Sequence, residues 1–224
     1  MSTHHFIEGK CAVCGAEVKY AILGSTNQFG SPDLDGRPSE MARSTMGFWV
    51  HECPNCGYVS DLLSDPTIVT REFLDSEEYR GCGGLPFDSF IAERFYKDYL
   101  ICREEGNHLA AFSSILCAAW DCDDNKNEEC AVRCRELAAA SFDDAVKECE
   151  DSHARDSMRV IKADVLRRSG HFYETISEYS GLTFDDKDSN AILEFQLAKA
   201  REGDTGCYRM SDVIDRKPGY TIYI

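Results

Sequence analysis

The sequence predicts an α+β protein, in which a small β-rich region at residues 1–84 precedes an α-helical region at residues 85–224. Gly and Pro interrupt the chain often up to about residue 86, and the segments between them are short and rich in β-forming residues. From residue 88 onward, apolar residues instead recur at the spacing of a helix face. The Gly-rich stretch at residues 81–86 is the boundary that these two patterns predict.

The first region contains four strand candidates, at residues 5–10, 17–23, 46–52 and 58–62. Between the second and third, residues 24–43 are rich in Gly, Ser, Pro and Asp and predict a long loop. Its most distinctive part is Ser-Pro-Asp-Leu-Asp-Gly-Arg-Pro at residues 31–38, where an Arg lies close to two Asp. Functional loops have this composition, and so do ordinary tight turns, which we favour here.

Two Cys-x-x-Cys-Gly units are the strongest signal in the chain, and their cysteines are Cys11, Cys14, Cys53 and Cys56. The two-residue gap lets both sulfurs of a pair face one ion, and the following Gly supplies the left-handed backbone that such a turn needs. Two turns of this kind provide four thiolates, the donor set of a closed tetrahedral Zn²⁺ site. Strand candidates flank both pairs, so the region is predicted to be a zinc ribbon. The loop at residues 24–43 explains why the pairs are further apart than the usual gap of about 15–20 residues.

Other interpretations of the cysteines are weaker. A redox Cys-x-x-Cys lies at a helix N-terminus, and no helical pattern follows Cys14 or Cys56. His51 is an alternative ligand, although we expect it to face outward on its strand. Four further cysteines could form a second metal site or be small core side chains, and we favour the core; they are Cys117, Cys122, Cys130 and Cys134.

The second region predicts helices joined by short turns, which makes successive helices antiparallel. We expect these helices at about residues 88–105, 109–120, 127–150, 158–169, 172–182 and 188–202. One hairpin matches the small, large, Gly and aromatic positions of a tetratricopeptide repeat, with Ala163, Leu166, Gly170, Phe172 and Tyr179. A generic helical bundle is the alternative, and the sequence leaves the two open. The last residues, 220–224, are strand-like.

Composition restricts the classes of partner. The 224-residue chain has a formal net charge of −16, from 24 basic and 40 acidic side chains, and both regions are acidic. Affinity for nucleic acid comes largely from clustered Lys and Arg, and no such cluster occurs, so we expect no binding to nucleic acid. The sequence has neither a secretory signal nor an apolar run long enough to span a bilayer, which predicts a cytoplasmic protein that does not enter a membrane.

Several of these features occur together in a fixed order. An early Cys-x-x-Cys-Gly unit and a Pro- and Asp-rich loop precede Phe48-Trp49-Val50, which runs into Cys-Pro-Asn-Cys-Gly-Tyr at residues 53–58 and then into helical hairpins containing Ala118-Ala119-Trp120. This order resembles a bacterial family catalogued as a domain of unknown function. The resemblance implies a zinc ribbon fused to tetratricopeptide-like helices, with zinc at the four cysteines of the paired units. It implies no catalytic residues.

The sequence therefore predicts a small β zinc ribbon followed by a tetratricopeptide-like antiparallel helix array. The leading functional hypothesis is a protein-interaction adaptor or scaffold, whose acidic concave helical surface binds a basic or amphipathic segment of another protein. The alternative is an enzyme with a site between ribbon and helices, to which Asp33, Asp35 or Arg37 contributes, although the usual catalytic motifs are missing. A nucleic-acid-binding ribbon is the third hypothesis.

Overall fold

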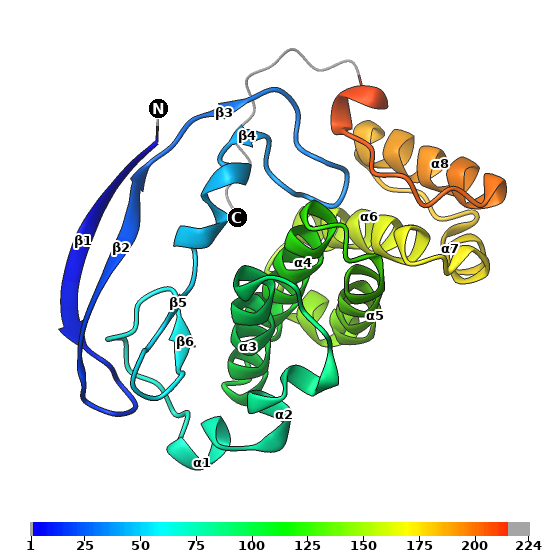
Figure 1. The fold of residues 1–224 in the computed structure, drawn as a ribbon. Helices are drawn as coiled ribbons and strands as arrows, with labels where there is room; N and C mark the ends of the chain where they lie inside the picture. Colours follow the sequence, from blue (N-terminus) through cyan, green and yellow to red (C-terminus); the bar gives the residue numbers. More distant parts are fainter. Residues whose placement is uncertain (1, 215–224) are drawn as a thin grey trace.

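The structure is a computed structural model that describes residues 2–214 (Figure 1). It is a mixed α and β fold, with short antiparallel strand pairs in the first 60 residues and helices from residue 71 onward. The strand expected at residues 220–224 lies outside the described residues. Within residues 2–214, no helix combines the length and the apolar composition that crossing a membrane requires.

The strands form three separate two-stranded pairs. β1 (Thr3–Lys10) pairs with β2 (Glu17–Ser25) along its whole length and forms a long hairpin at the edge of the molecule (Figure 1). β3 (Gln28–Phe29) pairs with β4 (Glu40–Met41), and β5 (His51–Glu52) pairs with β6 (Val59–Ser60). The turns after β1 and β5 carry the two cysteine pairs.

Of the strand expected at residues 46–52, residues 46–48 form the end of a 3₁₀ helix, η1 (Arg43–Phe48), and only the last two residues form β5. Thr45 accounts for the difference. Its backbone N–H and its Oγ1 both donate to the carbonyl of Ala42, at 2.9 and 2.7 Å, and its Oγ1 accepts from Trp49 Nε1 at 3.0 Å. Local hydrogen bonds of this kind compete with a strand, which needs a neighbouring chain to pair with.

Two short helices, α1 (Arg71–Leu74) and α2 (Glu77–Arg80), and the 3₁₀ turn η2 (Cys82–Gly84) follow the ribbon. These short elements have no counterpart among the elements expected from the sequence. Thr70 and Ser76 cap α1 and α2, because each side-chain oxygen accepts a hydrogen bond from a backbone N–H in the first turn. The segment positions Tyr79, a buried residue that contacts the metal-binding region described below.

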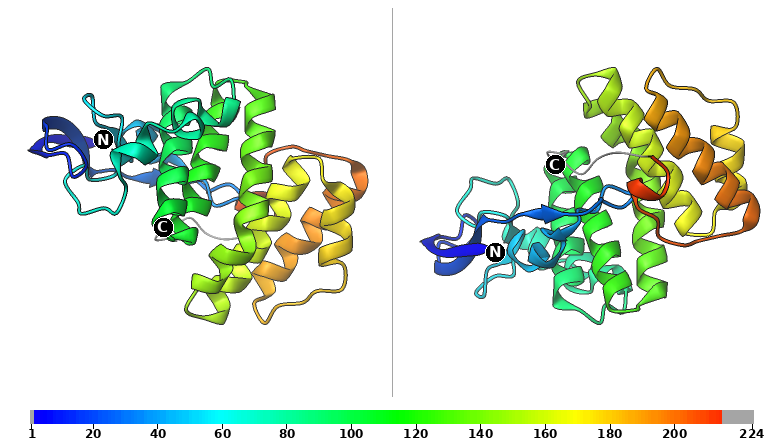
Figure 2. Two further views of the ribbon diagram at one scale, coloured as in Figure 1. Left: turned by 90° about the horizontal axis from the view of Figure 1, so that it is seen from below. Right: turned by 90° about the horizontal axis from the view of Figure 1, so that it is seen from above.

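The helical region agrees closely with the predicted helices. Its elements are α3 (Phe90–Glu104), α4 (His108–Asp124), α5 (Glu128–Ala145), η3 (Val146–Glu148), α6 (Ser152–Arg168), α7 (Phe172–Tyr179), α8 (Lys187–Glu202) and η4 (Met210–Asp212). Each of α3 to α6 packs on the next, and α6, α7 and α8 pack on one another. Figure 2 shows α6–α8 at the opposite end of the molecule from the β1–β2 hairpin. The tetratricopeptide-like arrangement stays a prediction.

The hydrophobic core crosses the predicted boundary at residue 84. One large cluster contains Val59 and Leu63 of the ribbon together with Phe95 of α3 and Ile115 of α4. A second cluster lies among α6, α7 and α8, and it includes Leu34 from the long loop. The division into two domains stays a prediction, but the two regions share buried apolar surface in both clusters.

Candidate metal centre

The two cysteine pairs meet at one point. The sulfur atoms of Cys11, Cys14, Cys53 and Cys56 all lie within 4.8 Å of one another. The Cys11 and Cys56 sulfurs are 3.6 Å apart, and the Cys14 and Cys53 sulfurs are 3.8 Å apart. Four sulfurs that surround one Zn²⁺ at about 2.3 Å lie about 3.8 Å from one another. The cluster can therefore hold a metal ion of this size.

The two turns that carry the cysteines have the same backbone hydrogen bonds. In the first, Cys11 N–H donates to Ala16 O at 2.9 Å and Gly15 N–H donates to Cys11 O at 2.8 Å. In the second, Cys53 N–H donates to Tyr58 O at 2.8 Å and Gly57 N–H donates to Cys53 O at 2.9 Å. Gly15 and Gly57 have φ values of 69° and 78°, the left-handed region that the sequence predicts for both. Each pair of sulfurs is thus held by a preformed turn.

Burial makes four thiolates without a bound cation costly at this site. Cys11, Cys53 and Cys56 are buried and Cys14 is half-buried. Burial raises the pKa of the Cys11 thiol and that of the Cys56 thiol. Asn55 Nδ2 donates to Cys14 Sγ at 3.3 Å and lowers the pKa of Cys14 to about 6. A bound cation removes this conflict, because it keeps all four sulfurs as thiolates in a poorly hydrated place.

The composition of the cluster indicates what chemistry it supports. Its four ligand atoms are all sulfur, and no other group of three or more potential ligands occurs among residues 2–214. A tetrahedral ion with four thiolates has no open position for water or substrate, so the site is suited to holding the fold and not to catalysis.

Neighbouring residues tie the centre to the rest of the protein. Tyr79 of α2 donates its hydroxyl hydrogen to Gly57 O at 2.6 Å, which fixes the second turn against the helices. Leu63 holds the first turn through its backbone. Its carbonyl accepts a hydrogen bond from Ala12 N–H at 2.9 Å, and its N–H donates to Tyr20 Oη at 3.0 Å. Sequence reasoning missed these contacts because no spacing rule relates Tyr79 to the cysteines.

His51 is not part of the cluster, and the expectation that it faces outward was wrong. It is buried, and its ring packs against that of Tyr20 with 4.5 Å between centroids. Burial, followed by the charge of Arg94, lowers the pKa of His51. The histidine is therefore a neutral packing residue beside the centre.

The four cysteines that offered a second metal site are all buried, and they divide between two hydrophobic clusters. They belong to no group of potential metal ligands in the part of the chain that the structure describes. These positions agree with the interpretation of Cys117, Cys122, Cys130 and Cys134 as core side chains.

The loop at residues 31–38 is also buried, and its charged side chains pair with other protein groups. Asp33 forms an ion pair with Arg43 at 2.6 Å, and Arg37 forms one with Asp124. Asp35 is paired with helix residues described below. Two surface hollows are lined by residues outside this loop. The one of about 320 Å³ is lined by Pro66, Thr67, Ile68 and Glu105. The one of about 520 Å³ is lined by Glu8, Gly9, Lys10, Glu17, Val18 and Lys19. Asp33, Asp35 and Arg37, the residues of the enzyme hypothesis, thus each form an ion pair with another side chain of the protein.

No family model, curated protein or solved structure gives a significant match to the chain. The family resemblance expected from the sequence is therefore without support from these comparisons. Inference about function rests on the geometry of the four cysteines and of the helical region.

Proposed function

We propose that the protein binds one structural Zn²⁺ through Cys11, Cys14, Cys53 and Cys56 and serves as a protein-interaction adaptor or scaffold. The observation that carries the metal assignment is the spacing of the four sulfurs, which matches the edge of a tetrahedral zinc–thiolate site. Zinc is favoured over other divalent ions because an all-thiolate donor set excludes magnesium and calcium, which take oxygen ligands.

The adaptor role has its support in the helical region and in the loop. Stacked antiparallel helices offer extended side-chain surfaces for binding other proteins. The charged side chains of the loop form ion pairs with Arg43, Asp124 and Arg168, so no observation among the described residues favours the enzyme hypothesis. The proposed partner is a protein with a basic or amphipathic segment. We propose no role in binding nucleic acid or membranes, because the net charge of the chain is −16.

Metal analysis tests the zinc assignment. We expect one zinc per chain by elemental analysis after chelator-free purification, with sulfur-only coordination by X-ray absorption. Replacement of Cys53 by Ser should remove most of the zinc and lower the melting temperature, because metal binding contributes directly to the folding free energy of such sites. The matched control is Cys207→Ser, since Cys207 is exposed and outside the cluster. Protein that is folded but free of metal, or that holds two zinc ions, would contradict the assignment.

A further inference from the structure

Residues 30–39 make an excursion that the ribbon itself does not require. The β3–β4 pair closes the base of the loop, because Phe29 is paired with Glu40. Between these two residues the chain extends away from the strands to the ends of α4 and α6 and then returns (Figure 1). A short turn could join the same two strands. The excursion therefore has its contacts on the helices and not on the ribbon.

The apolar contact of the excursion is Leu34. Its side chain is buried in the cluster formed by α6, α7 and α8, where its neighbours include Val160 and Leu193. Gly36 lies beside the same helices: its φ is 88°, and a Cβ there would make an ordinary van der Waals contact with Ile161 Cδ1 at 3.6 Å. Residues from the ribbon side of the chain thus fill a gap between helices at the far end of the molecule.

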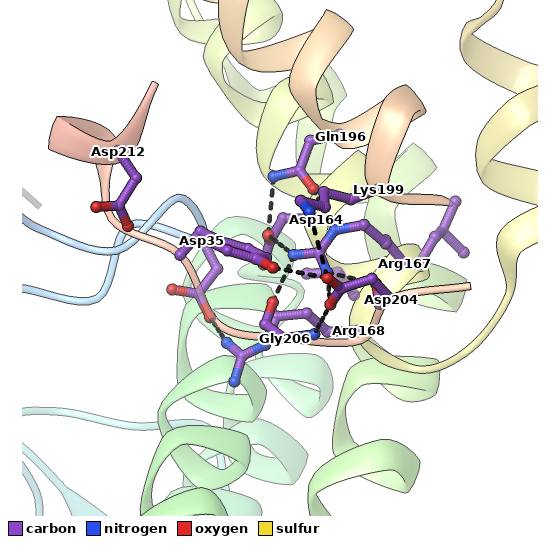
Figure 3. A network of polar contacts seen from close by, with 12 residues as sticks. Asp35, Asp164, Arg167, Arg168, Gln196, Lys199, Asp204, Gly206 and Asp212 are labelled. Carbon is purple, nitrogen blue, oxygen red and sulfur yellow. Dashed lines mark hydrogen bonds and ion pairs between the residues drawn. The ribbon is translucent and has the colours of Figure 1, made fainter. Parts of the chain in front are cut away.

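The ionic contacts are equally specific. Asp35 Oδ2 accepts a hydrogen bond from Arg168 at 2.6 Å (Figure 3). It also accepts one from Trp120 Nε1 at 2.9 Å. Arg37 pairs with Asp124 at the end of α4. Asp35 and Arg37 therefore each meet an oppositely charged group of the helices, and each contact is buried on at least one side.

The backbone of the excursion also forms hydrogen bonds with the segment that follows α8. Leu34 N–H donates to Tyr208 O at 2.9 Å, Met210 N–H donates to Pro32 O at 2.9 Å, and Asp33 forms a β-bridge with Arg209. The segment that follows α8 thus pairs with the excursion through one isolated antiparallel β-bridge. Strand addition combined with side-chain pockets is a common way for proteins to bind extended peptides.

We propose that α4, α6 and residues 208–210 form a peptide-binding surface, and that residues 33–37 (Asp-Leu-Asp-Gly-Arg) occupy it as an internal ligand. The external partner is a protein segment of the same chemistry: a Leu between two acidic residues, followed by Gly and Arg. This inference deepens the adaptor proposal, on which it rests, and it does not depend on the metal. It selects an amphipathic partner rather than a basic one: the Leu is apolar, and the carboxylate that follows it faces Arg168.

An internal ligand competes strongly with an external one. A tethered segment has an effective concentration of about 1 mM when its linker is short and well matched. The wild-type protein should therefore bind such a partner weakly, and any change that releases residues 33–37 should expose the surface.

A peptide-binding measurement on the full chain tests the proposal. The protein variant is Leu34→Ala with Asp35→Asn, which weakens the internal ligand and leaves the helices unchanged. The probe is a fluorescein-labelled peptide of residues 29–39, followed by anisotropy and by its effect on the melting temperature. We expect the variant to bind the peptide at least about tenfold more tightly than the wild-type protein does. Ligand binding should also raise the melting temperature of the variant.

Two controls define the specificity. A peptide with the same two substitutions should bind at least about tenfold more weakly than the wild-type peptide, because it lacks the Leu side chain and the carboxylate that Arg168 contacts. Glu40→Gln, at an exposed position of the same loop, should behave like the wild-type protein. If the double variant does not fold alone, peptide present during refolding should restore its far-UV helical signal.

The outcomes separate this inference from the zinc assignment, since zinc content is measured on the same samples. A folded, zinc-loaded variant that neither binds the peptide nor is stabilised by it overturns the internal-ligand proposal and leaves the zinc site intact. Equal binding of both peptides also overturns it. If the variant is unfolded and the peptide does not restore its helical signal, the internal-ligand proposal is likewise overturned.

Discussion

At the scale of single residues, the contact between Asp35 and Arg168 is the one that most clearly joins the two regions of the chain. The side chain of Asp35 is 0% exposed and that of Arg168 is 7% exposed. Arg168 retains a second partner in Asp123, at 2.6 Å, and Arg135 contacts the same carboxylate. Two buried arginines would therefore share one carboxylate if Asp35 lost its charge.

Asp35→Asn should consequently destabilise the protein without changing its volume. We expect the free energy of unfolding to fall by about 3 kcal/mol, the lower end of the range for breaking a buried ion pair. Urea denaturation followed by Trp fluorescence measures this, since Trp120 contacts the substituted group. The exposed substitution Glu40→Gln serves as the control. A loss below about 0.5 kcal/mol, typical of surface substitutions, would show that the pair contributes little.

The metal-ligand candidates could be predicted because their signal is local, whereas the residues around them could not. Cys-x-x-Cys-Gly fixes a turn by its own composition, and both turns formed as expected. Asp35 and Arg168 are separated by 133 positions. No spacing rule relates residues so far apart, so the loop was interpreted as ordinary turns. The burial of His51 depends in the same way on a distant neighbour, Tyr20.

At the scale of elements, the two cysteine turns depend on glycine. At Gly15 an added Cβ meets nothing within 4 Å, and at Gly57 it meets only Glu52 Oε1 at 3.7 Å. Space is therefore available at both positions, and the cost of a side chain there comes from the positive φ of the backbone.

Gly57→Ala should lower the free energy of unfolding by about 1–2 kcal/mol, the usual cost of left-handed backbone for a residue with a Cβ. Zinc should also be released to a chelator faster than from the wild-type protein, because the strained turn holds Cys53 and Cys56. Gly47→Ala is the matched control, since Gly47 lies in η1, does not have a positive φ and has ordinary space for a Cβ. Equal chelation rates for the two variants would argue against this role of the glycine.

The helices were predictable at this scale and η1 was not. Capping residues such as Asn107 and Asp186 mark the helix starts, and each accepts a backbone hydrogen bond in the first turn. The end of η1 and the residues after it, Phe48-Trp49-Val50, are β-forming, but the hydrogen bonds of Thr45 give the stretch a local alternative. Propensity decides the structure of a segment only where such alternatives are weaker.

At the scale of the whole molecule, the question is whether residues 85–224 are stable without the ribbon. The large hydrophobic cluster includes side chains from both regions, and Leu34 and Asp35 complete contacts of the helices. We expect the fragment 85–224 to melt at a lower temperature than the full chain and over a broader range, because apolar surface is exposed and Arg168 loses a partner. Circular dichroism and calorimetry measure both properties.

The fragment experiment also decides the predicted division at residue 84. A fragment that melts as sharply and at the same temperature as the helical signal of the full chain would establish two independent domains. The comparison requires zinc-loaded full-length protein, since loss of metal would lower its stability for a separate reason.

The pairing of residues 31–34 with the segment around Tyr208 has a consequence for biosynthesis. The hydrogen bond between Ser31 and Ser211 joins positions 180 residues apart. A ribosome adds roughly 5–20 residues per second, so this pairing cannot form until on the order of ten seconds or more after residue 31 has been polymerised. Throughout that interval the nascent chain carries residues 31–34 without the segment around Tyr208, with which they pair in the folded protein. A chaperone or partner protein that recognises this segment has its best opportunity during translation, before the C-terminal residues emerge and complete the fold.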